Sequence, residues 1–361
     1  MRIAFFGSSL VSAYWNGAAT YYRGLLQALA RRGHAITFYE PDAFGRQQHR
    51  DIDDPDWARV VVYAPDEGAV RAALREAGEA ADVLIKASGV GVFDALLEQT
   101  VAAAGRRDLL TAFWDVDAPA TLSRLAVHPD DPFLRLIPRY DVIFTYGGGP
   151  RAVHGYLQRG ARSCVPVHNG LDVATHHPVP PDPRYAADLL FVGHRLPDRR
   201  ERIAEFFLKA AAALPDRRFL IGGNGWEEEA LPANVRPLGH VFTHQHNLLN
   251  CSARAVLNVN RDGMADFGWS PPTRLFEVAG AGGCLITDAW DGIEAFLAPG
   301  TEVLVAKDGA EVAAIVGTLL PERARAIGEA ARRRALAEHT YEQRAALADA
   351  TLAALAVDRA A

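Results

Sequence analysis

Short apolar runs alternate with helical segments twice along the chain, and this alternation narrows the folds that the chain can adopt. The first alternation runs from residue 2 to residue 167, and a second runs from residue 188 to residue 306. A strand, a helix and a further strand in succession form a right-handed crossover between parallel strands. The pattern therefore predicts an α/β protein with two doubly wound sheets, which bind ligands at the carboxyl ends of their strands.

Hydrophobic periodicity and turn residues define the expected elements. In the first half we expect strands at 2–6, 35–39, 60–63, 82–87, 109–114, 142–146 and 164–167, and helices at 17–32, 67–81 and 92–104. In the second half we expect strands at 188–192, 218–221, 255–260, 284–287 and 302–306, with a helix ending near 213 and tail helices at 321–338 and 341–356. A proline-rich linker at 176–183 lies between the halves. We expect domains at 1–172 and 173–340, with the helical segment 341–361 packing back toward the first.

Composition excludes several classes of protein. Hydrophobic residues make up 49% of the 361 residues and charged residues 23%, as in soluble globular proteins. The net charge of −6 argues against a nucleic-acid-binding protein, although it is compatible with a local basic pocket. The three cysteines, Cys164, Cys251 and Cys284, are far apart and predict neither disulfides nor a zinc site. The chain starts with a strand pattern rather than a signal peptide and has no apolar run of about 20 residues, so we expect a cytoplasmic protein without a transmembrane segment.

The stretch 269–288, WSPPTRLFEVAGAGGCLITD, predicts a short helix followed by a buried strand. Ser270 is a suitable N-cap, and Pro271 suits the first helical position. Arg274 then lies in the first turn, where the helix dipole disfavours a cation, and Glu277 follows on the same face. A phosphate bound at the helix N-terminus would account for Arg274, and an exposed ion pair with Glu277 accounts for it equally well.

Other strand ends in the second half carry basic and glycine-rich sequences that suit an anion. Together with the helix described above, the candidate ligand-binding residues are Gly193, His194, Arg195, Arg199, Arg200, Asn224, Gly225, Trp226, Ser270, Thr273, Arg274 and Glu277. For Arg199 or Arg200 alone, a solvated position at the start of a helix is the simpler interpretation.

Three strand ends in the first half are candidates for the acceptor side of a site. They contain Tyr14, Asn16, Gly17, Asp115, Asp117, Gly147, Gly148 and Gly149. Asp115 and Asp117 form a D-x-D motif, which elsewhere can hold a metal-bound nucleotide sugar and here could supply a base. The alternatives are a loop that only packs at 8–17, an Asp117 side chain that caps the next helix, and a flexible turn at the three glycines.

Neither a dinucleotide cofactor nor a metal is expected. The loop after the first strand lacks the G-x-G-x-x-G fingerprint, which argues against NAD or FAD. His176 and His177 are adjacent in the linker, and no third ligand has a metal-binding spacing. We therefore interpret this histidine pair as exposed linker residues.

Six motifs together carry a family resemblance. The second half contains FVGHRLPDRR at 191–200, GGNGW at 222–226, LNVNR at 257–261 and SPPTRLFEVAGAGGCLITD at 270–288. The first half contains WDVDAP at 114–119 and HNGLD at 168–172. These motifs resemble those of the group 1 glycosyltransferases, most closely their CgeB-like branch, the spore maturation protein type. The second half is matched well and the first half more loosely.

The resemblance implies the GT-B architecture, in which two Rossmann-like domains face each other across a cleft and the second holds most of the nucleotide sugar. It implies that Glu277 binds the ribose hydroxyls of the donor, and that Arg274 with Arg199 or Arg200 binds the diphosphate. It also implies catalysis without a bound metal, because basic side chains stabilise the leaving diphosphate. We therefore expect a hexosyltransferase-like enzyme that moves a sugar from a nucleotide-diphosphate sugar to an unidentified acceptor, without a further cofactor.

The chain departs from the family pattern at one position. Retaining members of the wider superfamily often carry a Glu-x7-Glu pair, but Trp269 stands where its first glutamate would be. Retention and inversion therefore both remain open, and for inversion Asp117 or Asp115 is the candidate base. The alternatives to a transferase are a catalytically silent nucleotide-sugar-binding or assembly protein and a GT-B-shaped nucleotide-sugar epimerase.

Overall fold

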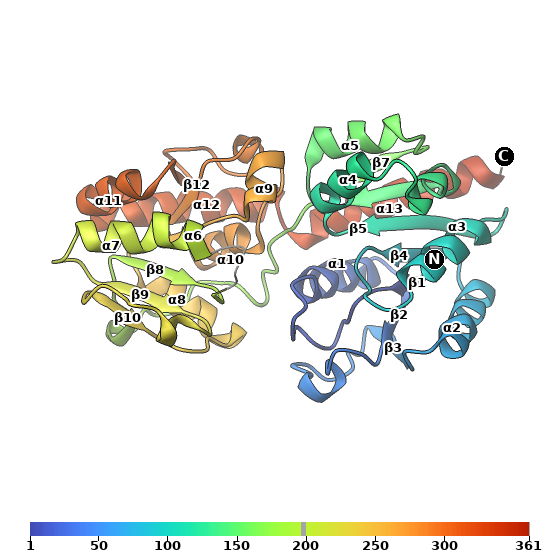
Figure 1. Ribbon diagram of the computed structural model, residues 1–361, viewed down its shortest axis with the longest axis horizontal. Coiled ribbons are helices and arrows are strands. Elements are labelled where there is room, and N and C mark those ends of the chain that lie inside the picture. The colour runs from blue at the N-terminus through green and yellow to red at the C-terminus, as the bar shows by residue number, and fades with distance from the viewer. Residues whose placement is uncertain (196–199, 361) are drawn as a thin grey trace. The chain divides into compact units, whose positions relative to one another are not determined.

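The protein consists of two compact units in a computed structural model that describes residues 1–195 and 200–360 (Figure 1). Unit 1 contains Met1–Asn169 and Tyr341–Ala361, and unit 2 contains Gly170–Thr340. The C-terminal helix therefore belongs to the same unit as the N-terminal strand. Within the described residues, no helix combines the length and apolar composition needed to cross a membrane.

Unit 1 is built on a seven-stranded parallel sheet with the order β3-β2-β1-β4-β5-β6-β7. Its strands are β1 (Arg2–Phe6), β2 (Ala35–Pro41), β3 (Ala58–Tyr63), β4 (Val83–Ala87), β5 (Leu110–Asp115), β6 (Val142–Thr145) and β7 (Cys164–Pro166). Its α-helices are α1 (Ala19–Arg31), α2 (Glu67–Ala80), α3 (Asp94–Ala104), α4 (Ala118–Val127), α5 (Gly149–Gln158) and α13 (Tyr341–Ala360). The strand order changes direction between β1 and β4, which is where doubly wound sheets bind ligands.

Helix α13 completes the core of unit 1 by packing against α1 and the sheet. Tyr341, Ala345 and Leu352 lie in one apolar cluster with α1 side chains and with Trp114 of β5. Gly24 of α1 permits this contact, since a Cβ there would lie 2.2 Å from two ring carbons of Tyr341. Helix α13 is therefore an integral part of this core.

Unit 2 is built on a six-stranded parallel sheet with the order β10-β9-β8-β11-β12-β13. Its strands are β8 (Leu189–Val192), β9 (Phe219–Gly222), β10 (Val235–Pro237), β11 (Val256–Asn258), β12 (Leu285–Asp288) and β13 (Leu304–Ala306). Its helices are α6 (Arg200–Ile203), the π-helical turn η5 (Ala204–Leu208), α7 (Lys209–Ala213), α8 (His246–Ser252), α9 (Asp262–Phe267), α10 (Thr273–Ala281), α11 (Gly309–Thr318) and α12 (Pro321–Glu338).

Both faces of the second sheet are buried, as a parallel sheet requires. Alternate residues of β8 enter different clusters: Leu189 and Phe191 pack with η5, α7 and α11, whereas Leu190 and Val192 pack with α8, α10 and α12. Helix α10 is thereby held against the sheet by Leu275.

Two expectations about unit 2 are corrected by the structure. The three-residue strand β10 was not anticipated, because a run of Val235, Arg236 and Pro237 has no strand periodicity. Ser270 was expected to cap the helix, but α10 starts at Thr273 with Pro272 as its N-cap residue, and the Ser270 hydroxyl donates to the Gly268 carbonyl at 3.0 Å. Two successive prolines keep the chain extended before Thr273, since the residue before a proline disfavours helical geometry.

The packing of α13 on α1 predicts opposite effects for two glycine-to-alanine substitutions. Gly24→Ala should lower the free energy of unfolding by about 1–3 kcal/mol, because the new methyl group would overlap the Tyr341 ring. Gly78→Ala in α2 is the matched control, since a Cβ there meets no atom within 4 Å and should stabilise the helix by roughly 0.5–1 kcal/mol. Urea denaturation measures both changes, and equal stability of the two variants would contradict the α1–α13 contact.

Candidate functional site

The first turn of α10 carries a guanidinium group that has no hydrogen-bond partner among the described residues. Arg274 is only partly exposed, and its Cζ lies 5.8 Å from the centroid of the Phe191 ring. Burial lowers the pKa of Arg274, while the charge of Glu277 opposes that shift. Among the residues that the structure describes, none accepts a hydrogen bond from this guanidinium. A partly buried cation with several unused donors is costly, and an anion at this position would compensate for that cost.

Glu277, one turn further along α10, is ionised. Its side chain is 14% exposed, and Oε2 lies 3.7 Å from Nδ1 of His246. Burial raises the pKa of Glu277, but the nearby imidazoles and Arg274 outweigh burial, so the pKa is lowered from its usual value. A carboxylate in this state accepts hydrogen bonds from hydroxyl groups. Thr273 starts the same helix and is partly buried beside it.

Two further arginines converge on a single carboxylate. The Arg195 Nε donates to Glu229 Oε2 at 2.8 Å, and the Arg200 NH2 donates to Glu229 Oε1 at 2.7 Å. The hydrogen bonds from Arg200 and then Arg195 lower the pKa of Glu229 to about 2. A phosphate could reach these two guanidinium groups only by sharing them with Glu229 or displacing it. Arg199 lies outside the described residues.

The glycine-rich ends of β8 and β9 support each other through backbone contacts. The Gly193 amide donates to the Gly222 carbonyl at 2.8 Å, and the Asn224 amide donates to Nδ1 of His194 at 3.0 Å. Gly225 has a φ of 90°, which glycine adopts without strain. These loops present backbone at the carboxyl ends of two adjacent strands.

Trp226 has a different role from the ligand contact expected for it. Its side chain is 1% exposed, and the indole N–H donates to the Gly193 carbonyl at 2.7 Å. The ring packs edge-on against Phe191 in the core. The indole therefore supports the loop from below and offers no surface to a ligand. Ser270, which is 1% exposed, is likewise part of the protein interior.

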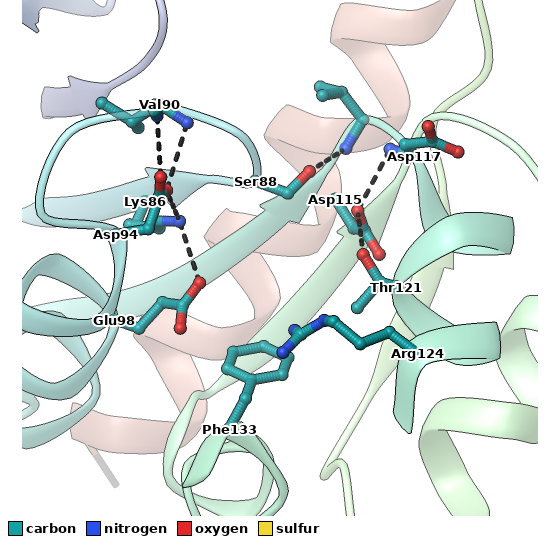
Figure 2. A network of polar contacts seen from close by, with 12 residues as sticks. Lys86, Ser88, Val90, Asp94, Glu98, Asp115, Asp117, Thr121, Arg124 and Phe133 are labelled. Carbon is teal, nitrogen blue, oxygen red and sulfur yellow. Dashed lines mark hydrogen bonds and ion pairs between the residues drawn. The ribbon is translucent and has the colours of Figure 1, made fainter. Parts of the chain in front are cut away.

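In unit 1, the two aspartates of the D-x-D motif differ in environment (Figure 2). Asp115 is fully buried and accepts hydrogen bonds from the Thr121 hydroxyl at 3.1 Å and the Tyr156 hydroxyl at 2.5 Å. Its Oδ1 also accepts from the Asp117 amide at 3.1 Å. Asp117 is exposed and caps α4 by accepting from the Ala120 amide at 3.4 Å. The burial of Asp115 therefore argues against it as the base. The Asp117 side chain caps α4 and is also exposed to solvent.

The remaining acceptor-side candidates lie in two loops of unit 1. Asn16 is 7% exposed and donates to the carbonyls of Ser9 at 2.8 Å and Ser12 at 2.9 Å, so it organises the loop that contains it. Tyr14 is 40% exposed and stacks on His49 at a centroid distance of 4.0 Å. Gly17 has open space around it.

The three consecutive glycines precede or begin α5. Gly147, Gly148 and Gly149 are buried, and the last two have φ angles of 86° and 42°. The left-handed backbone at Gly148 explains why glycine occupies this turn.

One group of residues at the site was missed from the sequence. His176 is 3% exposed, so the expectation that both linker histidines are exposed is wrong for this residue. One ligand atom from each of His176, His246 and Glu277 lies within 4.8 Å of the others. No spacing motif could reveal this cluster, because its members come from three separate segments of unit 2. His177 is exposed, as expected.

Comparisons with known proteins point to one fold. A family model described as glycosyl transferase-like matches residues 199–349. No curated protein matches the chain. Among solved structures, a sucrose-phosphate synthase from Thermosynechococcus elongatus is similar, with a TM-score of 0.73, 16% identity and coverage of 98% of this chain and 99% of that one.

Two further structures contain a nucleotide. Anabaena HepE in complex with UDP and glucose has a TM-score of 0.68 and 15% identity, covering 98% of this chain and 100% of its own. An α-glucosyltransferase in complex with UDP and a DNA 13-mer has a TM-score of 0.67 and 11% identity, covering 99% of each chain. The similarity extends over both units in all three structures, and the chain therefore has the two-domain α/β fold of the GT-B glycosyltransferases.

Proposed function

We propose that this protein is a glycosyltransferase that moves a sugar from a uridine-diphosphate sugar to an acceptor not yet identified. The observation that carries the proposal is the Arg274 guanidinium, which has no hydrogen-bond acceptor in the described part of the chain, beside the ionised carboxylate of Glu277 on α10. A nucleoside diphosphate offers an anion and ribose hydroxyls a short distance apart, which matches the two groups. The UDP bound in HepE and in the α-glucosyltransferase supports uracil as the base of the nucleotide.

Each group on α10 has a separate role in donor binding. The N-terminus of α10 and Arg274 hold the diphosphate, and Glu277 accepts hydrogen bonds from the ribose. Arg195 and Arg200 add further positive charge in the segment after β8. Both guanidinium groups also donate hydrogen bonds to the Glu229 carboxylate. As the bond to the sugar breaks, these groups stabilise the leaving diphosphate, so transfer needs no bound metal.

Asp117 is the proposed general base of an inverting reaction. The acceptor oxygen attacks the anomeric carbon, the bond from that carbon to the diphosphate oxygen breaks, and the acceptor proton passes to the Asp117 carboxylate. The exposed position of Asp117, two residues after the end of β5, supports this role. Trp269 stands where retaining members of the superfamily often carry the first glutamate of the Glu-x7-Glu pair, which is compatible with an inverting reaction.

Arg274→Ala tests the diphosphate assignment. The variant should bind UDP roughly tenfold to hundredfold more weakly, because a charge-assisted hydrogen bond contributes about 1.5–3 kcal/mol. Isothermal titration calorimetry measures the affinity. Arg325→Ala is the control, since Arg325 is exposed on α12 in a 3.9 Å ion pair with Glu329 and should leave UDP binding unchanged. Equal UDP affinity in the wild type and both variants would refute the assignment.

Asp117→Asn separates catalysis from helix capping. Asparagine caps a helix about as well as aspartate, so the stability should hold while donor hydrolysis, with water as the acceptor, slows roughly hundredfold or more. Asp115→Asn should instead lower the free energy of unfolding by about 1–3 kcal/mol, because the Thr121 or Tyr156 hydroxyl loses its buried acceptor. An Asp117→Asn enzyme with wild-type kcat would exclude Asp117 as the base.

A further inference from the structure

Three potential metal ligands converge beside the first turns of α10. His176 comes from the segment after Leu171, His246 is the first residue of α8, and Glu277 lies on α10. Their ligand atoms all lie within 4.8 Å of one another, and the closest named pair, His246 Nδ1 and Glu277 Oε2, is separated by 3.7 Å. Nε2 of His176 is buried and has no hydrogen-bond partner among the described residues. A buried imidazole nitrogen without a partner is a donor atom ready for a ligand.

Close backbone packing places His176 in this cluster. Gly280 lies on α10 three residues after Glu277, and a Cβ there would lie 2.8 Å from the His176 carbonyl oxygen. Only glycine therefore lets the segment approach the helix so closely. The segment is also attached to α8, because the Asn247 amide donates to the Thr175 carbonyl at 2.9 Å and its oxygen accepts from the His177 amide at 3.3 Å. The three ligands are thus positioned before any metal binds.

We propose that His176, His246 and Glu277 form a binding site for Zn²⁺. Two imidazoles and one carboxylate with an open fourth position are a common ligand set for zinc. With bonds of about 2.0–2.1 Å in tetrahedral geometry, ligand atoms lie roughly 3.4 Å apart, so small side-chain rotations would bring this cluster to the required distances. Mg²⁺ prefers oxygen ligands and should not bind here.

Zinc at this site would regulate the protein rather than serve the transfer. Glu277 is the residue proposed above to bind the donor ribose, and this step of the inference rests on that proposed function. A carboxylate bound to Zn²⁺ commits one oxygen and part of its charge to the metal, so it is a weaker acceptor for the ribose hydroxyls, and the metal occupies space beside it. Zinc and the nucleotide should therefore weaken each other's binding.

Calorimetric titration of the full chain with ZnCl₂, without nucleotide, tests the metal site alone. The wild type should bind one Zn²⁺, and His176→Ala and His246→Ala should each weaken binding at least tenfold. His177→Ala is the matched control, because His177 is adjacent but exposed, and should bind zinc as the wild type does. Zinc should also raise the melting temperature of the wild type and of His177→Ala. MgCl₂ should produce neither effect.

Wild-type zinc affinity in both His176→Ala and His246→Ala would overturn the site, as would an equal loss in His177→Ala. Circular dichroism establishes whether each variant is folded. If His176→Ala does not fold, the zinc affinity of His246→Ala tests the site.

A second titration measures UDP affinity with and without ZnCl₂. Zinc should weaken UDP binding at least tenfold in the wild type and leave it unchanged in His176→Ala, which also controls for chelation of zinc by UDP itself. Zinc binding without this competition would overturn the sharing of Glu277. Tight UDP binding without any zinc binding would overturn the metal site and leave the proposed function standing. Zinc binding without UDP binding would overturn the proposed function and leave the metal site standing.

Discussion

Two opposite charges on α10 are withdrawn from water without pairing with each other, and the candidate site depends on this arrangement. The Arg274 guanidinium faces the Phe191 ring, while the Glu277 carboxylate faces two imidazoles. Within the described part of the chain, no hydrogen bond joins these two charges. Partly buried charges are costly when unpaired. A ligand that brings phosphate and hydroxyl groups would satisfy both charges, and this supports the proposal of a nucleotide sugar over an uncharged ligand.

The backbone before α10 is held in a strained conformation that fixes the start of the helix. Gly268 and Trp269 have φ angles of 75° and 51°, and the Trp269 amide donates to the Asp291 carbonyl at 2.7 Å. A Cβ at Gly292 would lie 2.4 Å from the Trp269 ring, so the two loops fit together closely. Positive φ at a tryptophan costs about 1–3 kcal/mol, and such strain is often found near ligand sites. The strained loop therefore presents the first turn of α10 in one defined position.

The alternation of strands and helices predicted both sheets, because hydrophobic periodicity reports which faces are buried. It did not reveal β10, whose three residues carry no period, or the true start of α10 after Pro272. Positions at strand ends suggested ligand contacts for Asp115 and Trp226, yet both side chains point into the core. A strand end gives the location of a residue along the sheet but not the direction of its side chain.

The His176 cluster shows the other limit of sequence reasoning. His176 reaches Glu277 because Gly280 allows its segment to approach α10, and that contact leaves no local sequence pattern. By contrast, the unusual placement of Arg274 in a first helical turn was visible from the sequence, since the helix dipole disfavours it there. Local electrostatic conflicts can be predicted from sequence, whereas contacts between distant segments require the fold.

A crystal structure of the protein with UDP tests most directly whether α10 holds the nucleotide. We predict that the diphosphate lies at the first turn of α10 within hydrogen-bond distance of Arg274, with the ribose hydroxyls on Glu277. A UDP molecule bound with its diphosphate away from Arg274 and its ribose away from Glu277 would contradict both assignments.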